Sequence, residues 1–330
     1  MTSVLDVRGL SVRIRLSGGR FVHAVDNVSF SVEPGEIVAL VGESGCGKTM
    51  LAMSILGLLP EGGEVTAGEV RLLDEDLSRA SSSRMREIRG REVGTIFQEP
   101  MSSLNPVMTI GRQIAEVVER HERVSSRVAR DRAIELVELV GIPEARRRVD
   151  QYPHEMSGGM AQRAIIAMAI ACKPRLLLAD EPTTALDVTI QAAILRVIDD
   201  LRRRLDMAVV LITHDLGVVA DVADRVVVMY AGRAVEQSPV LDLFAAPQHP
   251  YTLGLLGAVR HPATVPRSRL KEIPGIVPTV MSPATSCTFA PRCPRATDRC
   301  RTELPLLTPQ RPDHSAACFH PGAMPTAARP

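Results

Sequence analysis

The fold is decided by the stretch Gly42-Glu43-Ser44-Gly45-Cys46-Gly47-Lys48-Thr49. It fits the pattern G-x-x-x-x-G-K-[ST], in which glycines let the backbone amides turn toward a bound phosphate. The apolar run Ile37–Val41 before it predicts a buried strand, and Met50–Leu59 after it predicts a helix. A phosphate-binding loop requires this order of strand, loop and helix, because the helix N-terminus adds partial positive charge. We therefore expect the whole stretch to bind nucleotide phosphates rather than to form a simple glycine-rich turn.

A second element of the same site is the apolar run Leu176–Ala179, which Asp180 and Glu181 follow. The run predicts a buried strand, and ligands bind at the carboxyl ends of strands in open α/β sheets. We expect Lys48 to reach the β- and γ-phosphates and the Thr49 hydroxyl to ligate Mg²⁺. Asp180 is placed to hold Mg²⁺ through water, and Glu181 to act as general base toward the attacking water. The alternative is a strand that ends in a solvated acidic turn. The presence of the phosphate-loop motif in the same chain argues against this alternative.

Length and composition limit which classes of protein this chain can belong to. The chain has 330 residues, a formal net charge of +1 and 45% hydrophobic residues, which suits one large α/β domain with an appendage. Near-neutral charge gives no argument for nucleic acid as a partner. Charged residues stand where a signal peptide needs an apolar core, and no apolar run approaches the roughly 18 residues of a membrane span. We expect a soluble cytosolic protein with reduced cysteines.

The order of predicted elements indicates a doubly wound α/β domain. Alternating polar and apolar residues before residue 100 predict strands, and helical spacing of apolar residues from about 105 to 160 predicts a helical insertion. The runs Val209–Ile212 and Val226–Met229 predict further strands buried on both faces. Between residues 179 and 209, apolar residues recur on one helical face, so strand, helix and strand alternate.

The composition changes near residue 241. Of the 24 prolines, 15 lie from Pro247 onward, and four of the six cysteines lie there too. A segment this rich in proline cannot be mainly helix or sheet, so it needs something besides a large core to hold it together. We therefore predict a nucleotide-binding domain over residues 1–240, a helical subdomain over about 101–160 and a separate extension over 241–330.

Further motifs follow the phosphate loop in a fixed order. Gln98 comes after a predicted strand, Ser157-Gly158-Gly159-Met160 comes next, and Ser157 is typical of a helix N-cap. The acidic strand end follows, then Ala185-Leu186-Asp187, and then Thr213-His214-Asp215 after another strand. In this order the motifs resemble the ATP-binding cassette (ABC) ATPases over essentially all of residues 1–240.

The resemblance implies a pair of cassettes that face each other head to tail and enclose two ATP molecules. Ser157, Gly158, Gly159 and Met160 would form the signature that contacts the γ-phosphate bound by the partner's loop. The side chain of Gln98 would ligate Mg²⁺ and sense the γ-phosphate. His214 would contact the γ-phosphate and orient the water next to Glu181, and Asp187 would communicate across the dimer.

Two positions depart from the family pattern. Relatives stack an aromatic side chain on adenine near the end of the first strand, where this chain has Ile14. Phe21 on the following loop is the candidate substitute, although its ring could equally belong to the core. Ala161 stands where relatives often carry a basic residue after the signature.

Two segments are similar to the ATPases of oligopeptide and dipeptide importers. The first is Gln98-Glu99-Pro100-Met101-Ser102-Ser103-Leu104-Asn105-Pro106, which in nickel and peptide importers receives the coupling helix of a membrane subunit. The second is the extension, with His249-Pro250-Tyr251-Thr252-Leu253, Ile273-Pro274-Gly275-Ile276-Val277-Pro278 and four cysteines.

The cysteines Cys287, Cys293, Cys300 and Cys318 have the spacing C-x5-C-x6-C-x17-C. Four thiolates can enclose one metal centre and so replace a missing core. The two C-x-x-C pairs of zinc ribbons are absent, so the spacing favours a [4Fe–4S] cluster, with which some relatives with this tail are associated. Zinc, with His314 and His320 as spare ligands, and four unligated cysteines are the alternatives. The four arginines among the cysteines, at positions 292, 295, 299 and 301, would offset the cluster's negative charge.

The sequence therefore predicts an ATPase subunit that uses ATP and Mg²⁺ to energise import of peptides. It would act at the cytoplasmic face of the membrane, peripherally, with a second ATPase subunit (a heterodimer or a homodimer) and two permease subunits. An extracytoplasmic binding protein would choose the cargo, and no nucleic acid is expected. Alternatives are import of nickel or another small solute, a soluble non-transport ABC ATPase, and an iron–sulfur redox protein. The last predicts an impaired site, yet Lys48, Asp180, Glu181 and His214 are all present.

Overall fold

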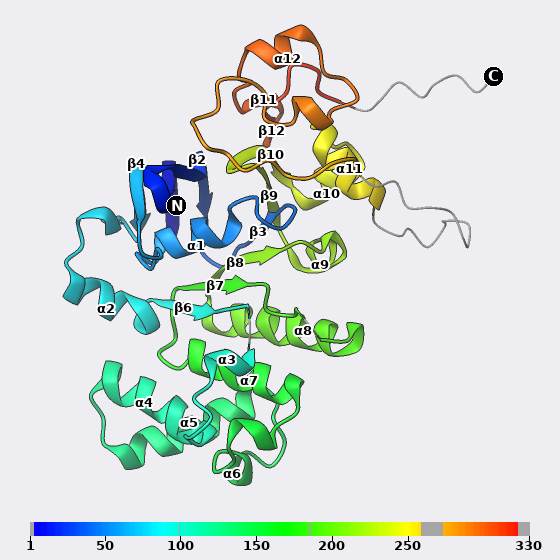
Figure 1. Cartoon of the computed structure of the whole chain (residues 1–330). Helices are drawn as coiled ribbons and strands as arrows, with labels where there is room; N and C mark the ends of the chain where they lie inside the picture. Colours follow the sequence, from blue (N-terminus) through cyan, green and yellow to red (C-terminus); the bar gives the residue numbers. More distant parts are fainter. Residues whose placement is uncertain (1–2, 99, 185, 259–272, 323–330) are drawn as a thin grey trace. The chain divides into compact units, whose positions relative to one another are not determined.

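The computed structural model describes residues 3–98, 100–184, 186–258 and 273–322 (Figure 1). The chain forms two compact units, each assembled from segments that are distant in sequence. The first unit consists of Met1–Leu5, Ser31–Ile37 and Arg71–Ile212. The second consists of Asp6–Phe30, Val38–Val70 and Thr213–Pro330.

The first unit contains the strands that carry the acidic site residues. Strands β6 (Val93–Ile96), β7 (Leu176–Asp180) and β8 (Ala208–Thr213) lie side by side and run parallel, with Ile96 opposite Ala179 and Asp180 opposite Ile212. Strands β7 and β8 are buried along their whole length, as their uninterrupted apolar runs predict. Helix α8 (Val188–Leu205) connects them and buries one face, which confirms the predicted strand–helix–strand order.

The helical insertion is present in the same unit, and Figure 1 shows its helices gathered together. Side-chain caps begin three of them, with Thr109, Ser125 and Ser157 each accepting a backbone N–H of the first turn. Its helices are α3 (Pro100–Ser103), α4 (Ile110–Glu122), α5 (Ser126–Leu139), α6 (Ala145–Arg148) and α7 (Gly158–Ala169). The unit also contains the short strand β5 (Glu75–Asp76) and helix α2 (Ser82–Arg91).

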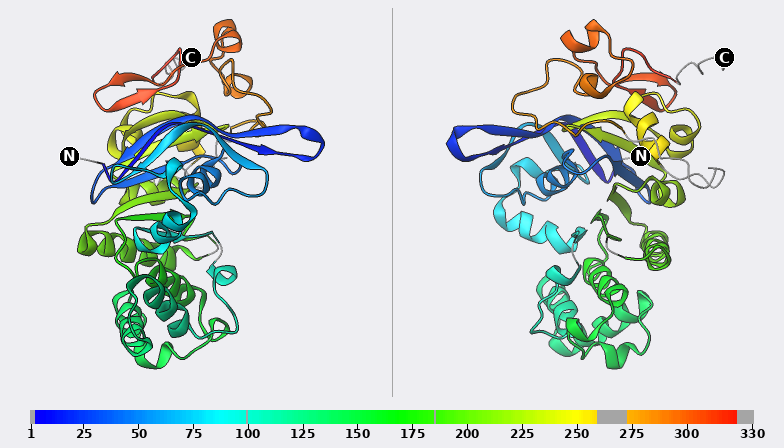
Figure 2. Two further views of the ribbon diagram at one scale, coloured as in Figure 1. Left: turned by 90° about the vertical axis from the view of Figure 1, so that its left-hand side faces the viewer. Right: turned by 45° about the vertical axis from the view of Figure 1, so that its right-hand side comes forward.

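The second unit contains the strand that leads into the phosphate loop. Strand β3 (Ile37–Val41) pairs in parallel with β9 (Arg225–Tyr230), and α1 (Lys48–Ile55) follows the loop. The predicted strand and helix around the loop are thus confirmed, although the helix ends four residues earlier than Leu59. In a second sheet, β1 (Leu5–Arg15) lies between β2 (Phe21–Val32) and β4 (Gly63–Leu72). Figure 2 shows β1 and β2, in dark blue, running side by side.

The sheet that contains β3 and β9 continues beyond β9 into the C-terminal extension. Strand β10 (Arg233–Pro239) pairs antiparallel with β9, and β12 (His314–Ala316) pairs antiparallel with β10. Strand β11 (Thr308–Arg311) then pairs with β12. The helices of this region are α9 (Leu216–Val222), α10 (Val240–Ala245), α11 (Pro250–Ala258) and α12 (Asp298–Thr302). Backbone pairing therefore joins the extension to the strands before it, and the regular elements it adds are short.

A buried carboxylate fixes this junction. Glu236 on β10 has no exposed surface, and its Oε1 and Oε2 atoms accept from the backbone N–H groups of Gln248 (2.6 Å) and His249 (2.9 Å) at the start of α11. Its Oε1 atom also lies 2.7 Å from Nε2 of His314 on β12, which is equally buried. One side chain therefore connects a strand, a helix start and a strand of the extension.

Replacing Glu236 by Ala is expected to lower the free energy of unfolding by about 3–5 kcal/mol, because His314 and two backbone donors would lose a buried partner. Urea unfolding of the full chain measures the loss. The matched control is Glu303→Ala, which removes an exposed carboxylate paired with Arg299 and should change stability by less than about 0.5 kcal/mol. Equal effects of the two substitutions would contradict this role of Glu236.

Candidate functional site

The phosphate loop of the second unit is built as its sequence predicts. Lys48 is the first residue of α1 and only 5% exposed, and its Nζ atom donates to the carbonyl oxygens of Gly42 (2.7 Å) and Glu43 (3.1 Å). The backbone N–H of Cys46 also points to the Glu43 carbonyl oxygen (3.3 Å). The loop thus curls around the lysine ammonium, the cation that would meet the phosphates.

Two glycines of the loop are required by the space around them. Gly47 has φ +105°, and a Cβ atom there would lie 2.1 Å from the carbonyl oxygen of Ala24 on β2. A Cβ atom at Gly42 would lie 2.3 Å from the carbonyl oxygen of Met229 on β9. Any side chain at either position would push the loop away from its supporting strands, so the spacing of the motif follows from packing as well as from phosphate binding.

The acidic residues of the first unit lie at the carboxyl end of β7. Asp180 ends the strand and is buried, and Glu181 follows with φ +47°, a conformation that costs about 1–2 kcal/mol for a residue with a side chain. The Oε2 atom of Glu181 accepts from Nε2 of Gln98 (3.0 Å) and from the Thr184 hydroxyl (2.8 Å). Because β6 and β7 are parallel neighbours, the structure brings Gln98 and Glu181 together. No sequence pattern identified Thr184 as a partner of Glu181.

The signature residues begin helix α7. Ser157 is its N-cap, as predicted, with its hydroxyl oxygen 3.3 Å from the backbone N–H of Met160. Gly158 and Gly159 occupy the first two helical positions, where backbone N–H groups have no partner within a helix. Asp187 caps α8 by accepting from two backbone N–H groups, and Ala185 lies outside the described residues.

The remaining cassette residues lie in the second unit. His214 follows β8 and is exposed, and Asp215 after it caps helix α9. Phe21 begins β2 and is partly exposed, and the Arg13 guanidinium lies 4.3 Å from the centre of its ring. Because the ring is partly exposed, the structure does not place Phe21 in the buried core as the alternative had it.

The four cysteines of the extension line one small closed cavity, together with Arg295, Phe289, Phe319 and His320. Burial raises the pKa of Cys287 and Cys293, and burial with the charges of the other cysteines raises that of Cys318 to about 11. Such thiols stay protonated at neutral pH unless a metal takes the proton's place. Two nitrogens of Arg295, Nε and Nη2, are buried without a hydrogen-bond partner, a feature that a negatively charged group in the cavity would resolve.

The surroundings of the cavity correct one expectation about charge. Of the four arginines near the cysteines, the structure places only Arg295 in the lining. Arg292 pairs with Glu43, Arg299 with Glu303 and Arg301 with Asp298. The expectation that all four arginines balance charge at the cysteines is therefore wrong for these three. Carboxylates attract their guanidinium groups more strongly than neutral thiols do.

The geometry also bears on the zinc alternative. His314 is held by Glu236 and does not line the cavity, whereas His320 lines it and lies 3.0 Å from the Thr297 hydroxyl. Within the described ranges, no three His, Cys, Asp or Glu side chains are arranged to hold one metal ion. A mononuclear zinc site is therefore not seen among these residues, and neither is a ready-made cluster site.

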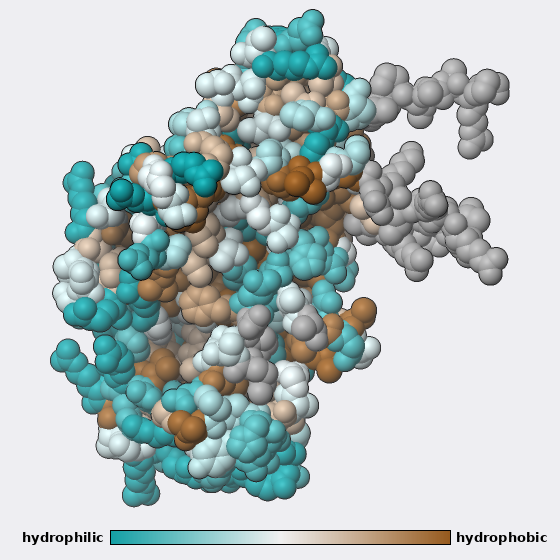
Figure 3. All heavy atoms as spheres, in the orientation of Figure 1, coloured by the Kyte–Doolittle hydropathy of each residue, from teal (hydrophilic) through white to brown (hydrophobic). Residues whose placement is uncertain are grey.

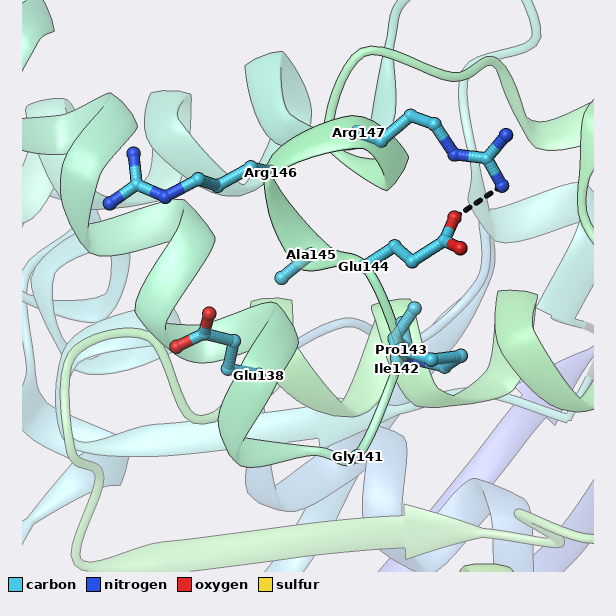
Figure 4. Close-up of a pocket in the computed structure, with 8 residues that line it drawn as sticks. All are labelled: Glu138, Gly141, Ile142, Pro143, Glu144, Ala145, Arg146 and Arg147. Atoms are coloured by element: carbon cyan, nitrogen blue, oxygen red, sulfur yellow. Dashed lines mark ion pairs between the residues drawn. The ribbon is translucent and has the colours of Figure 1, made fainter.

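A separate shallow pocket lies on the helical subdomain, between the end of α5 and α6 (Figure 4). Arg147 and Glu144 extend to the same side of α6 and form an ion pair at 2.5 Å, while Glu138 and Arg146 lie on the opposite side. Exposed ion pairs recur on this subdomain, and the face of it in view in Figure 3 is mostly hydrophilic. None of the predicted site residues lines this pocket.

Comparison with known proteins places the chain in a family. Residues 25–184 match the model of the family described as "ABC transporter", and residues 235–300 match "Oligopeptide/dipeptide transporter, C-terminal region". The "Probable peptide ABC transporter ATP-binding protein y4tR" of Sinorhizobium fredii is 53% identical, over 96% of this chain and 94% of that protein. The "Dipeptide transport ATP-binding protein DppD" of Escherichia coli K12 is 47% identical, over 97% of each.

Solved structures agree at the level of the fold. The "post-hydrolysis state of the ATP-binding cassette MJ0796 bound to ADP and Pi", a dimer, is 26% identical and covers 72% of this chain and 98% of that one, with a TM-score of 0.64. No helix in the described part of the chain has both the length and the apolar character that crossing a membrane requires. The α/β cassette fold, the phosphate loop and the similarity along the whole chain together establish that this protein is an ATP-hydrolysing cassette of the ABC transporter family, in the group of the peptide transport ATP-binding proteins.

Proposed function

We propose that this chain hydrolyses ATP to energise the import of peptides through an ABC transporter. The observation that carries the proposal is that the similarity to peptide transport proteins runs through the extension as well as the cassette. Cassettes of many transporters share the phosphate chemistry, so the extension is the part that distinguishes the cargo class. Import of nickel or another small solute is the alternative that a transport assay must separate.

In the proposed reaction, Gly42–Thr49 holds the triphosphate and Lys48 exchanges its two loop carbonyl partners for phosphate oxygens. Thr49, Asp180 and Gln98 would hold Mg²⁺, which neutralises charge that builds up on the phosphate oxygens. Glu181 takes a proton from water as the water oxygen bonds to the γ-phosphorus and the bond to the β–γ bridging oxygen breaks.

The other cassette residues would complete this centre. His214 would contact the γ-phosphate and orient the water beside Glu181, and Phe21 would stack on adenine. The signature Ser157–Met160 would act on the ATP of a partner cassette, which is another ATPase subunit of the same or a different sequence, and Asp187 would link the two sites. Two permease subunits would receive the force at the helical subdomain, so the chain would sit peripherally on the cytoplasmic side of the membrane.

For the extension, we propose that Cys287, Cys293, Cys300 and Cys318 hold a [4Fe–4S] cluster. Their shared cavity and the unpartnered donors of Arg295 support it, because a thiolate-bound cluster carries negative charge. Each thiolate binds a different iron, so the four sulfurs need not converge on one point as they do around zinc. Such a cluster would cross-link segments that otherwise have little core of their own.

The change Cys293→Ser is expected to remove most of the iron and to lower the melting temperature of the anaerobically purified chain. Iron and zinc analysis, with absorbance near roughly 400 nm for the cluster, measures the loss. Cys172→Ser is the matched control, since this thiol belongs to the first unit and does not line the cavity. Wild-type protein that contains neither iron nor zinc would contradict the metal centre.

The function is tested by reconstituting the chain with its permease and ATPase partners in vesicles. We expect ATP-dependent uptake of a labelled peptide when the binding protein is present, and no uptake with Glu181→Gln. Uptake of Ni²⁺ but not of peptides would favour the alternative cargo. ATP hydrolysis without any transport would leave the chain an ATPase and overturn the import proposal.

A further inference from the structure

Glu43 of the phosphate loop is held by two residues of the extension. Its carboxylate forms a two-point ion pair with Arg292, with Nη1–Oε2 at 2.7 Å and Nη2–Oε1 at 3.0 Å. Its backbone N–H donates to the Tyr251 hydroxyl oxygen at 2.8 Å. Its carbonyl oxygen accepts from Lys48 Nζ at 3.1 Å. All of these residues belong to the second unit, and both extension residues stand more than 200 positions after Glu43.

The guanidinium of Arg292 is fixed on its other side as well. Its Nε atom donates to the carbonyl oxygen of Pro274 (2.8 Å), and Nη2 donates to that of Ile273 (3.2 Å). The ring of Tyr230 lies 5.7 Å away, and the side chain of Arg292 is only 5% exposed. Hydrogen bonding to Glu43 raises the pKa of Arg292, so the guanidinium stays charged. A buried, fully engaged arginine is a rigid clamp rather than a mobile surface charge.

Tyr251 is equally rigid. It has no exposed surface, and its ring packs against those of Tyr230 (4.7 Å between centres) and Phe289 (5.4 Å). Burial raises the pKa of its hydroxyl, which therefore remains neutral. The hydroxyl oxygen accepts a hydrogen bond from the backbone N–H of Glu43 and so fixes the plane of the peptide between Gly42 and Glu43. That plane sets the direction of the Gly42 carbonyl, the closest partner of Lys48.

We propose that Arg292 and Tyr251 are positioning residues of the ATP site, through which the extension sets the shape and charge of the phosphate loop. The inference rests on the proposed assignment of Gly42–Thr49 as the phosphate loop. A carboxylate in such a loop repels the triphosphate, and Arg292 cancels its charge. Tyr251 holds the backbone around which the loop curls. The extension is thus part of the nucleotide site, and Arg292 stands next to Cys293 of the cysteine cavity.

The test measures ATP hydrolysis by the assembled transporter with the full chain, and resolves KM from kcat. Arg292→Gln should raise the KM for ATP about tenfold, because it leaves the Glu43 carboxylate unpaired beside the phosphates. The kcat should change less than about twofold, since the loop holds ground state and transition state alike. Adding Glu43→Gln to Arg292→Gln should recover most of the affinity by removing the uncompensated charge.

Three further variants sharpen the result. Arg292→Lys keeps the charge but not the two-point contact, and should raise KM by about threefold. Tyr251→Phe removes only the acceptor oxygen, and should raise KM to a similar extent. Arg301→Gln breaks the exposed pair with Asp298 on α12 and should match wild type. Melting temperatures measured alongside show which variants are folded.

The proposal is overturned if Arg292→Gln has the KM of Arg301→Gln, or if Glu43→Gln gives no recovery in a folded double variant. If Arg292→Gln does not fold, Arg292→Lys and Tyr251→Phe decide the matter, and an unchanged KM in both overturns it. Lys48→Ala separates this failure from failure of the proposed function. A wild-type transporter whose hydrolysis does not depend on Lys48 refutes the loop assignment itself.

Discussion

Glu181→Gln is expected to reduce ATP turnover by about a thousandfold while ATP still binds, because a general base contributes about 10²–10⁴ in rate. Glu181 directly follows the buried strand β7 and is oriented by Gln98 and Thr184, both through its Oε2 atom. Glutamine has nearly the same shape and can still accept these two hydrogen bonds, but it cannot take a proton from water. Binding and turnover should therefore separate in this variant.

The measurement is steady-state phosphate release by the assembled transporter, with ATP binding measured on the same sample. Lys48→Ala provides the contrast, since removing the loop cation should weaken binding and turnover together. Glu155→Gln is a control at an exposed carboxylate that accepts from the backbone N–H of Tyr152. Turnover by Glu181→Gln close to the wild-type rate would assign the base to another residue.

Ser157→Asp is expected to lower ATP turnover by about a hundredfold or more without unfolding the chain. Aspartate is as good an N-cap as serine, so it can still accept the Met160 N–H that Ser157 accepts at 3.3 Å. Its negative charge would face the γ-phosphate of the partner's ATP and repel it. The substitution therefore separates the structural role of the residue from its role in a shared site.

Ser125→Asp is the matched control, because Ser125 caps α5 in the same way and belongs to no predicted site. Both variants should keep the wild-type melting temperature, and only Ser157→Asp should lose activity. If the two variants retain equal turnover, Ser157 has no contact with phosphate. A large drop in melting temperature for Ser157→Asp alone would show that capping, not the charge, was changed.

Local sequence predicted the cassette well. The strands around the phosphate loop and the acidic pair are short uninterrupted apolar runs, and the helical insertion has clear helical spacing, so each element follows from its own residues. The N-cap at Ser157 follows from cap chemistry. The contact between Gln98 and Glu181 was not predicted, because it depends on β6 and β7 being neighbouring strands.

The missed contacts depend on packing between distant segments. Nothing near Glu43 in the sequence identifies Tyr251 or Arg292 as its partners, because only the folding of the extension brings them there. Arg292 was expected to balance charge at the cysteines, but a carboxylate accepts a guanidinium better than a neutral thiol does. Glu236 was missed for the same reason, as its role depends on two chain segments that close around it.

We propose that ATP is enclosed between two protomers, each of which completes the other's reaction centre. Retention of labelled ATP by the assembled transporter after rapid gel filtration tests it most directly. With Glu181→Gln in every copy, we predict that ATP stays bound through the column, and that adding Ser157→Asp releases it while equilibrium binding to the loop persists. Equal retention with and without Ser157→Asp would contradict the claim.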